Sequence, residues 1–327
     1  MTVALRPIDP ASYRPHSLHT ADRVWPQSNC YVDLCIELLH SNGYEPLAAA
    51  AFALTADLEG DLWTFFKFPI ADLERLYGIE IFELNVWRPL VNHVVDQLAQ
   101  KRCVIPDVDA FYLPDTAGTS YQTEHVKTSI AIQYLDLAGK RVGYFHNAGF
   151  YEASGEDFIN LFRLEGHLTS PEYLPPYVEV AKFGARRVTT EPALTAGAID
   201  LLRLHLGRAP AANPFHRYAA RFDHDLRWLA TEPLAVFHGY AFATLRQCGA
   251  SFEMVALFLK WLADRGEMGL DPAIEAFSDI AATAKSLQFR TARMVGAGKA
   301  FTPAPLLDGM ATAWDTGFGV LRARYGR

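Results

Sequence analysis

The stretch Trp25-Pro26-Gln27-Ser28-Asn29-Cys30-Tyr31-Val32-Asp33 runs directly into a helical pattern over residues 34–40. A proline, then small polar residues, then apolar residues at helical spacing predict that Cys30 lies in or just before the first turn of a helix. The unpaired backbone N–H groups and the helix dipole at that end favour a thiolate over a thiol. Two interpretations follow: Cys30 is a nucleophile, or it is a small buried hydrophobic residue.

The composition is that of a soluble globular protein, with 327 residues of which 50% are hydrophobic and 20% charged. The net charge of -7 argues against nucleic acid as the main partner. The four cysteines show no C-x-x-C spacing, so we expect reduced thiols and no bound metal or cofactor. We expect no secretory signal, because residues 1–15 have no basic segment that leads into an apolar run. No apolar run approaches the roughly 18 residues of a membrane span. We expect a cytoplasmic protein without membrane contact.

Residues 125–134 alternate polar and apolar side chains, which predicts a half-buried strand. A turn at 136–140 and a second strand over 141–147 complete an antiparallel hairpin. A change of composition between Pro176 and Thr190 separates a domain of residues 1–180 from one of residues 190–327. We expect an α+β domain with an antiparallel sheet, then an all-α domain. The helices expected in the second domain span residues 193–206, 215–230, 233–247, 252–265, 273–295 and 305–325.

A thiol enzyme needs a thiolate, an imidazole that moves the proton, and a third group that orients the ring. The chain order of papain-like thiol folds is cysteine, histidine, then asparagine or aspartate. The same order occurs here, with Cys30 at a helix start, His125 at a strand start and Asn147 at the end of the next strand. A hairpin brings its outer ends together, so His125 and Asn147 can be neighbours if a bulge or a longer loop shifts the pairing. The alternative for residues 144–147 is ordinary strand-end polarity.

An oxyanion would need donors near the sulfur. The backbone N–H of Cys30 and the side-chain amide of either Gln27 or Asn29 are available, and the sequence leaves the choice between these two amides open.

Other polar residues near the predicted triad have simpler interpretations. His146 points to the strand face opposite Asn147 and is a reserve base. Glu124 and Lys127 flank His125 and are expected to form a solvated pair at the rim of the site. Asp33 and Glu37, one helical turn apart, are interpreted as helix-surface acids. Residues 1–24 show no periodicity and are interpreted as an irregular lead-in.

Two resemblances rest on these residues. The first half resembles the N-terminal, cysteine-peptidase-like domain of the butirosin biosynthesis protein H type. It shares Asn29-Cys30 opening a helix, Val108-Asp109-Ala110-Phe111-Tyr112-Leu113-Pro114, His125 opening a strand, and Asn147 where that family tends to have aspartate. The whole chain resembles an uncharacterised bacterial family of this length, through residues 29–33, 65–68, 113–118 and 144–149.

The first resemblance implies a papain-like fold and an acyltransferase. Such an enzyme takes an acyl or aminoacyl group from the phosphopantetheine thioester of a carrier protein onto Cys30 and passes it to a small amine acceptor. A carrier protein is usually acidic, and the basic residues that could receive it are Lys182, Arg186, Arg187, Arg203 and Arg208, unless these form an ordinary solvated face. The alternatives are a cysteine hydrolase (peptidase, amidase or thioesterase) with the same triad, and a non-catalytic binding protein.

Overall fold

The computed structural model describes residues 2–5, 8–165, 170, 173–184, 188 and 190–326. The chain divides into two compact units. The sheet unit comprises Met1–Thr20, Asn29–Tyr44 and Ile70–Arg187, and the helical unit comprises Ala21–Ser28, Glu45–Pro69 and Val188–Arg327. The mixed α+β first half and the all-helical second half agree with the fold class expected from the sequence. The helical unit also includes two segments from the first 70 residues.

The sheet unit contains both strands and helices. Its strands are β1 (Thr2–Ala4), β4 (Ile79–Glu83), β5 (Arg102–Asp109), β6 (Lys127–Ser129), β7 (Ala131–Asp136), β8 (Arg141–His146), β9 (Gly149–Ser154) and β10 (Val178–Phe183). Its helices are η1 (Ser17–His19), α1 (Cys30–Ser41), α2 (Ile70–Tyr77), α3 (Leu90–Ala99), η3 (Ala110–Tyr112), η4 (Pro114–Thr116) and α4 (Glu156–Leu161).

The helical unit contains one small hairpin, and the rest of its regular structure is helical. The hairpin is β2 (Leu58–Glu59) with β3 (Leu62–Trp63). The helices are η2 (Pro46–Thr55), α5 (Glu191–Leu206), α6 (Pro214–Leu229), α7 (Leu234–Ala241), the π-helix η6 (Phe242–Arg246), α8 (Gln247–Ala263), α9 (Asp271–Ala297) and α10 (Ala304–Tyr325). Of all the helices in the described ranges, none combines the length and apolar character needed to cross a membrane.

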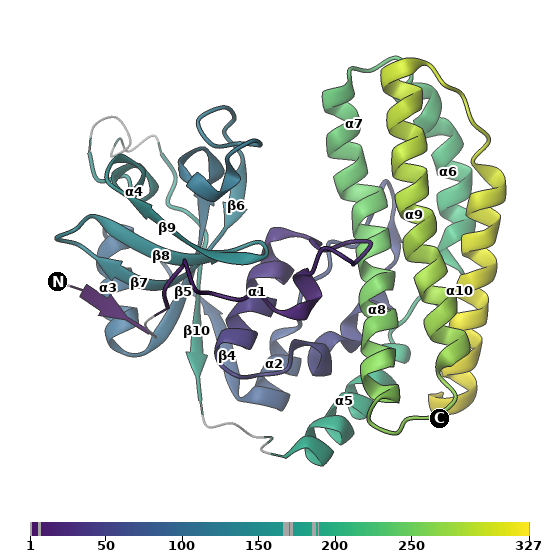
Figure 1. Cartoon of the computed structure of the whole chain (residues 1–327), viewed down its shortest axis with the longest axis horizontal. Helices are drawn as coiled ribbons and strands as arrows, with labels where there is room; N and C mark the ends of the chain where they lie inside the picture. Colours follow the sequence, from purple (N-terminus) through teal and green to yellow (C-terminus); the bar gives the residue numbers. More distant parts are fainter. Residues whose placement is uncertain are drawn as a thin grey trace. The chain divides into compact units, whose positions relative to one another are not determined.

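The sheet has eight antiparallel strands in the order β4-β10-β5-β7-β8-β9, with β1 paired to β7 and β6 to β5 (Figure 1). The predicted hairpin is confirmed as β7 and β8, with a bulge between Ile132 and Tyr134. The first part of the predicted strand differs, because β6 pairs with β5 from Asp107 to Asp109 rather than with β8. Pro106 lies where β5 changes neighbours from β7 to β6, and a proline offers no N–H to a strand ladder.

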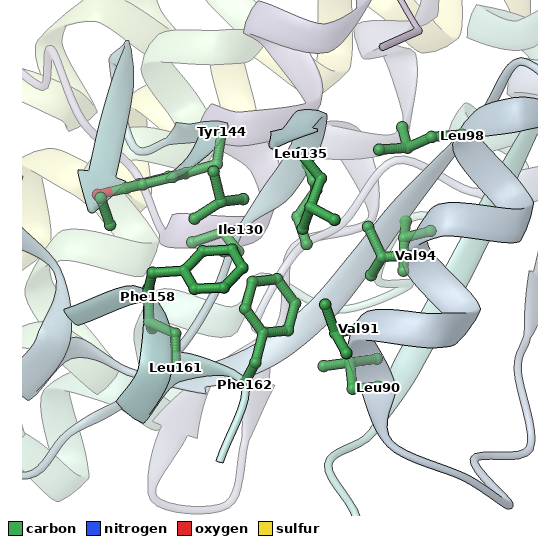
Figure 2. Close-up of a cluster of buried hydrophobic side chains, with 14 of the residues drawn as sticks. Leu90, Val91, Val94, Leu98, Ile130, Leu135, Tyr144, Phe158, Leu161 and Phe162 are labelled. Atoms are coloured by element: carbon green, nitrogen blue, oxygen red, sulfur yellow. The ribbon is translucent and has the colours of Figure 1, made fainter. Parts of the chain in front are cut away.

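The helices α3 and α4 cover one face of the sheet (Figure 2). The buried residues of α3 recur at helical spacing, which gives the helix an apolar stripe that packs on the strands. Figure 2 shows side chains of the two helices and the sheet converging on one another: Leu90, Val91, Val94, Leu98, Ile130, Leu135, Tyr144, Phe158, Leu161 and Phe162.

Helix α1 packs against β6 to β9 on the opposite face. The Tyr31 hydroxyl donates a hydrogen bond to Glu179 of β10. Glu179 lies opposite Ile105 in the register of β10 and β5, and directly opposed residues of an antiparallel pair point to the same face. Since side chains alternate along a strand, Asp107 and Asp109 share this face with Ile105. The carboxylates at the end of β5 therefore belong to the face that α1 covers.

Trp25 is buried within the helical unit, where it contacts α8 and α9. Its indole N–H donates to the carbonyl of Ala281 at 3.0 Å, and its backbone N–H donates to Glu253 at 2.9 Å. A Cβ on Gly249 would overlap the Trp25 ring. The sequence suggested a helix break near Gly249, and this is wrong: helical structure continues without a loop from α7 through η6 into α8. Gly249 does not end a helix. Its missing side chain leaves room for the indole of Trp25.

The interpretation of Asp33 and Glu37 as helix-surface acids is also wrong. Their exposed fractions are 1% and 0%. His19 of η1 lies between the two carboxylates, with Nδ1 paired to Glu37 and Nε2 3.4 Å from Asp33 Oδ1. Glu37 also accepts hydrogen bonds from the Tyr13 hydroxyl and the backbone N–H of His16. Buried charge thus fastens the N-terminal segment to α1.

The pKa values of this cluster follow from burial and attraction together. Burial alone would lower the pKa of His19, but its hydrogen bonds and attraction to Asp33 and Glu37 outweigh burial and raise it to about 9. Burial alone would raise the pKa of Glu37, whereas the bonds from His19 and Tyr13 lower it. Both groups are charged at neutral pH, and each compensates the other.

The His19 cluster predicts a pH dependence of stability. Because the pKa of His19 rises from 6.5 to about 9 on folding, its stabilisation is complete below pH 6.5 and is lost as the pH rises through about 9. The difference corresponds to roughly 3 kcal/mol. We expect the free energy of unfolding, measured by urea titration between about pH 6 and pH 10, to fall more steeply in the wild type than in His19→Gln. Parallel curves for the two proteins would contradict this.

Candidate functional site

Cys30 is the first residue of α1, as the sequence predicts. Asn29 caps the helix, because its side-chain oxygen accepts a hydrogen bond from the Val32 N–H at 3.0 Å. Cys30 is only partly buried, while the other three cysteines are buried: Cys35, Cys103 and Cys248. Burial raises the pKa of the Cys103 and Cys248 thiols, so these two sulfurs are inert. Of the four thiols, Cys30 is the one with access to a reagent.

His125 lies two residues before β6 and pairs with Asp109. Its Nδ1 is 2.6 Å from Asp109 Oδ2, and its ring stacks on Phe111 with centroids 4.4 Å apart. The pairing follows from the sheet, since Lys127 of β6 lies opposite Asp109 and brings the preceding residues to the end of β5. No hydrogen bond to Nε2 comes from any residue that the structure describes. A histidine held by a carboxylate at one nitrogen and free at the other has the arrangement of a general base.

The structure does not bring Asn147 to His125. Asn147 lies in the tight turn between β8 and β9 with a φ of 46°, a left-handed conformation that asparagine tolerates. Its amide nitrogen is 3.4 Å from Nδ1 of His146. Over the described ranges no hydrogen bond joins Asn147 to His125 or to Cys30. The pairing of β6 with β5 instead brings His125 to the end of β5, where it meets Asp109.

His146 belongs to a second histidine–aspartate pair, which is buried. Its Nδ1 is 2.6 Å from Asp115 Oδ2, and its Nε2 is 2.8 Å from the Thr128 hydroxyl. Asp115 also accepts a hydrogen bond from Tyr144 at 2.7 Å. Tyr144 packs in the cluster under α3 and α4, and His146, two residues on, points to the same face. The reserve base is therefore on the face opposite α1, with both ring nitrogens engaged.

The remaining predicted residues lie around this arrangement. Asn29 uses its side-chain oxygen as the helix cap, and Gln27 is exposed in a segment grouped with the helical unit. Lys127 pairs with Asp107 at 3.1 Å rather than with Glu124, which is exposed.

A cavity of about 770 Å³ opens beside His125 within the sheet unit. This volume is within the usual range of small-molecule sites. Its lining includes aromatic and charged side chains but not Cys30. The lining residues that bear on chemistry are Trp87, Arg88, Asp107, Asp109, Tyr112, His125, Arg163 and Tyr173.

Within the part of the chain that the structure describes, no group of three or more histidine, cysteine, aspartate or glutamate side chains could hold a metal ion. In the sheet unit, the histidine–carboxylate groups described above are the His125–Asp109 pair, the His146–Asp115 pair and the His19 cluster.

The sequence reasoning missed Asp109, Asp115 and His19. Asp109 ends a strand and stands in the segment that carries the first resemblance, which was a usable signal. Asp115 follows a proline in a 3-10 turn, and nothing local marks it as the partner of a histidine 31 residues later. His19 lies in a segment without periodicity, so the sequence did not predict its contact with α1.

Family models match both halves of the chain. The DUF1839 N-terminal domain matches residues 14–183, and the DUF1839 C-terminal domain matches residues 191–323. No curated protein matches the chain. These matches agree with the resemblance of the whole chain to an uncharacterised domain family.

The exposure of the thiols gives a direct test. We expect iodoacetamide to modify Cys30 in the native protein and to leave the three buried cysteines unmodified, because alkylation requires access to the sulfur. Peptide mapping by mass spectrometry locates the label, and unfolding in urea should expose all four sites. In Cys30→Ser, native labelling should disappear. Labelling of a buried cysteine before Cys30 would contradict the assignment.

Proposed function

The chain belongs to the DUF1839 family, and we propose that its N-terminal half is a thiol-dependent acyl or aminoacyl transferase. In this proposal the sheet unit is a papain-like fold of the butirosin biosynthesis protein H type. Cys30 carries the acyl group as a thioester, His125 moves the protons, and Asp109 orients the imidazole in the role that the sequence assigned to Asn147.

The pairing of His125 with Asp109 carries this proposal. A carboxylate 2.6 Å from Nδ1 holds the ring and stabilises the imidazolium that forms when Nε2 accepts a proton. The Phe111 ring stacked on the imidazole restricts it further. Asp109 takes the position that orients the base in thiol and serine enzymes, and it is available before any substrate binds.

The placement of α1 supports Cys30 as the nucleophile. The neighbouring Tyr31 bonds to Glu179, which places the first turn of α1 on the β5 and β10 face from which Asp107 and Asp109 point. The free N–H groups of a helix N-terminus stabilise negative charge that develops on an acyl oxygen nearby. The backbone N–H of Cys30 is the donor that the proposal assigns to the oxyanion.

Two steps complete the reaction. The Cys30 thiolate attacks the thioester carbonyl of phosphopantetheine, the bond from the acyl carbon to the pantetheine sulfur breaks, and the departing sulfur receives the proton that His125 took from Cys30. An amine then attacks the Cys30 thioester, the Cys30 sulfur leaves, and His125 transfers the amine proton to that sulfur. The pantetheine thioester and the Cys30 thioester are of similar energy, so the first step is readily reversible.

The proposed donor is an acidic carrier protein in the cytoplasm, and it requires a basic surface. Of the cluster expected from the sequence, Lys182 pairs with Glu80 and Arg203 with Asp200, while Arg186 and Arg187 lie outside the described residues. A better candidate is the C-terminal part of α9 and the residues after it. Residues 280–301 contain no aspartate or glutamate, and their basic residues are Lys285, Arg290, Arg293 and Lys299.

A cysteine hydrolase with the same residues is the second candidate. The side chain of His125 is 65% exposed, so water reaches the base without any rearrangement. A hydrolase would release the acyl group from Cys30 whether or not an amine is present. A transferase would release it faster as the amine concentration rises.

Replacement of the nucleophile tests the covalent step. We expect wild-type protein incubated with acetyl- or glycyl-loaded carrier protein to gain the mass of one acyl group, because the thioester exchanges onto Cys30. Cys30→Ala should gain none, as read by intact mass spectrometry, while Cys35→Ala serves as the matched control and should be acylated. Persistence of the adduct in Cys30→Ala would contradict the assignment of Cys30 as the nucleophile.

The orienting residue is tested separately. We expect His125→Ala to slow the acylation of Cys30 by about 10² to 10⁴, the usual contribution of a general base. Asp109→Asn should slow it too, because the amide does not stabilise the imidazolium, whereas Asn147→Ala should stay near the wild-type rate. Stopped reactions analysed by mass spectrometry give these rates. A loss confined to Asn147→Ala would restore the sequence-based triad.

A further inference from the structure

The cavity beside His125 contains one cation that no described carboxylate neutralises. Arg88 pairs with Asp96, Asp107 pairs with Lys127, and Asp109 pairs with His125. Arg163, which follows α4, has no ion pair with any residue in the described ranges. Among the described residues that line the cavity, the Arg163 guanidinium is therefore the cation without a carboxylate partner.

Arg163 is held in place by its surroundings. Its Nη1 donates to the carbonyl of Leu174 at 2.8 Å, and its Cζ lies 5.3 Å from the centroid of the Tyr173 ring. Its backbone has a φ of 51°, in the left-handed region that non-glycine residues rarely adopt. A guanidinium fixed by one hydrogen bond and one ring keeps its other N–H donors in a fork that matches a carboxylate or a phosphate.

The other side chains that line the cavity favour a ligand with an apolar part next to its anionic group. Trp87, Tyr112 and Tyr173 line the same cavity, as does His125. Aromatic rings bind planar or aliphatic groups, and the few polar groups fix the orientation of the ligand.

We propose that this cavity binds an organic anion whose carboxylate or phosphate meets Arg163 while its apolar part lies against the aromatic residues. The candidate anions are taken from the proposed function, and in this respect the inference rests on it. The phosphate of the phosphopantetheine arm and the carboxylate of an amino acid acceptor share this chemistry, and the experiment separates them.

The test compares charged and neutral forms of each source in the full-length Cys30→Ala protein, so that binding is measured without transfer. Phosphopantetheine is compared with pantetheine, and phenylalanine with phenylalaninamide, by isothermal titration calorimetry. Arg163→Gln is then made in the same background. Arg102→Gln is the matched control, because Arg102 bonds to Gln97 and does not line the cavity.

We expect at least about a tenfold preference for the charged member of one pair, the usual size of a charged hydrogen bond. The preference should disappear in Arg163→Gln and persist in Arg102→Gln. A preference for phosphopantetheine assigns the cavity to the donor, and a preference for phenylalanine assigns it to the acceptor. Equal binding of charged and neutral forms in both pairs, or an unchanged preference in Arg163→Gln, overturns the inference.

Two further measurements keep the outcomes distinct. Arg163→Lys retains the charge without the fork and should keep part of the preference, which covers the case in which loss of the Leu174 bond unfolds the glutamine variant. If no carrier acylates wild-type Cys30 but the preference at Arg163 is present, the proposed function fails and the anion site stands.

Discussion

Two buried carboxylates on α1, those of Asp33 and Glu37, lie against the two ring nitrogens of His19. Asp33 and Glu37 are removed from water on the face that meets the N-terminal segment, and His19 supplies the compensating charge. A buried charge left without a partner costs several kcal/mol, so α1 and η1 hold their places together. Cys30 begins α1, and Tyr31 in its first turn bonds to the sheet. The position of the candidate nucleophile on the sheet thus depends on an ion cluster two turns further along the helix.

The sheet unit uses the same pair of side chains twice with opposite consequences. His146 and Asp115 are buried, bond to Thr128 and Tyr144, and tie the η4 turn to β8. Such a fully satisfied network stiffens the core and leaves no nitrogen for a substrate. His125 and Asp109 make the same contact at an exposed edge, where one nitrogen stays free. The two pairs contain the same residue types, and they differ in burial and in the number of ring nitrogens that are bonded.

The sequence predicted those features that local chemistry decides. The start of α1 follows from Asn29 as a cap, and the β7–β8 hairpin follows from alternating side chains around a turn. The partner of His125 was missed because β6 pairs with β5, a strand that lies about 20 residues earlier in the chain. The burial of Asp33 was missed because its partner lies in a segment with no pattern of its own. Distant contacts of this kind leave no local trace.

The Trp25 contact has a consequence for how the chain can be divided. Trp25 precedes the candidate nucleophile by five residues, yet Gly249 of α8 leaves room for its ring, and Glu253 accepts from its N–H. A cut at the boundary between the two family domains would separate the Trp25 indole from the helices that bury it. Glu253 would also lose the hydrogen bond from the Trp25 backbone N–H. Exchange of the helical half with that of a relative would have to carry residues 21–28 and 45–69 along with it. The boundary between the two family domains therefore does not coincide with the division of the chain into its two compact units.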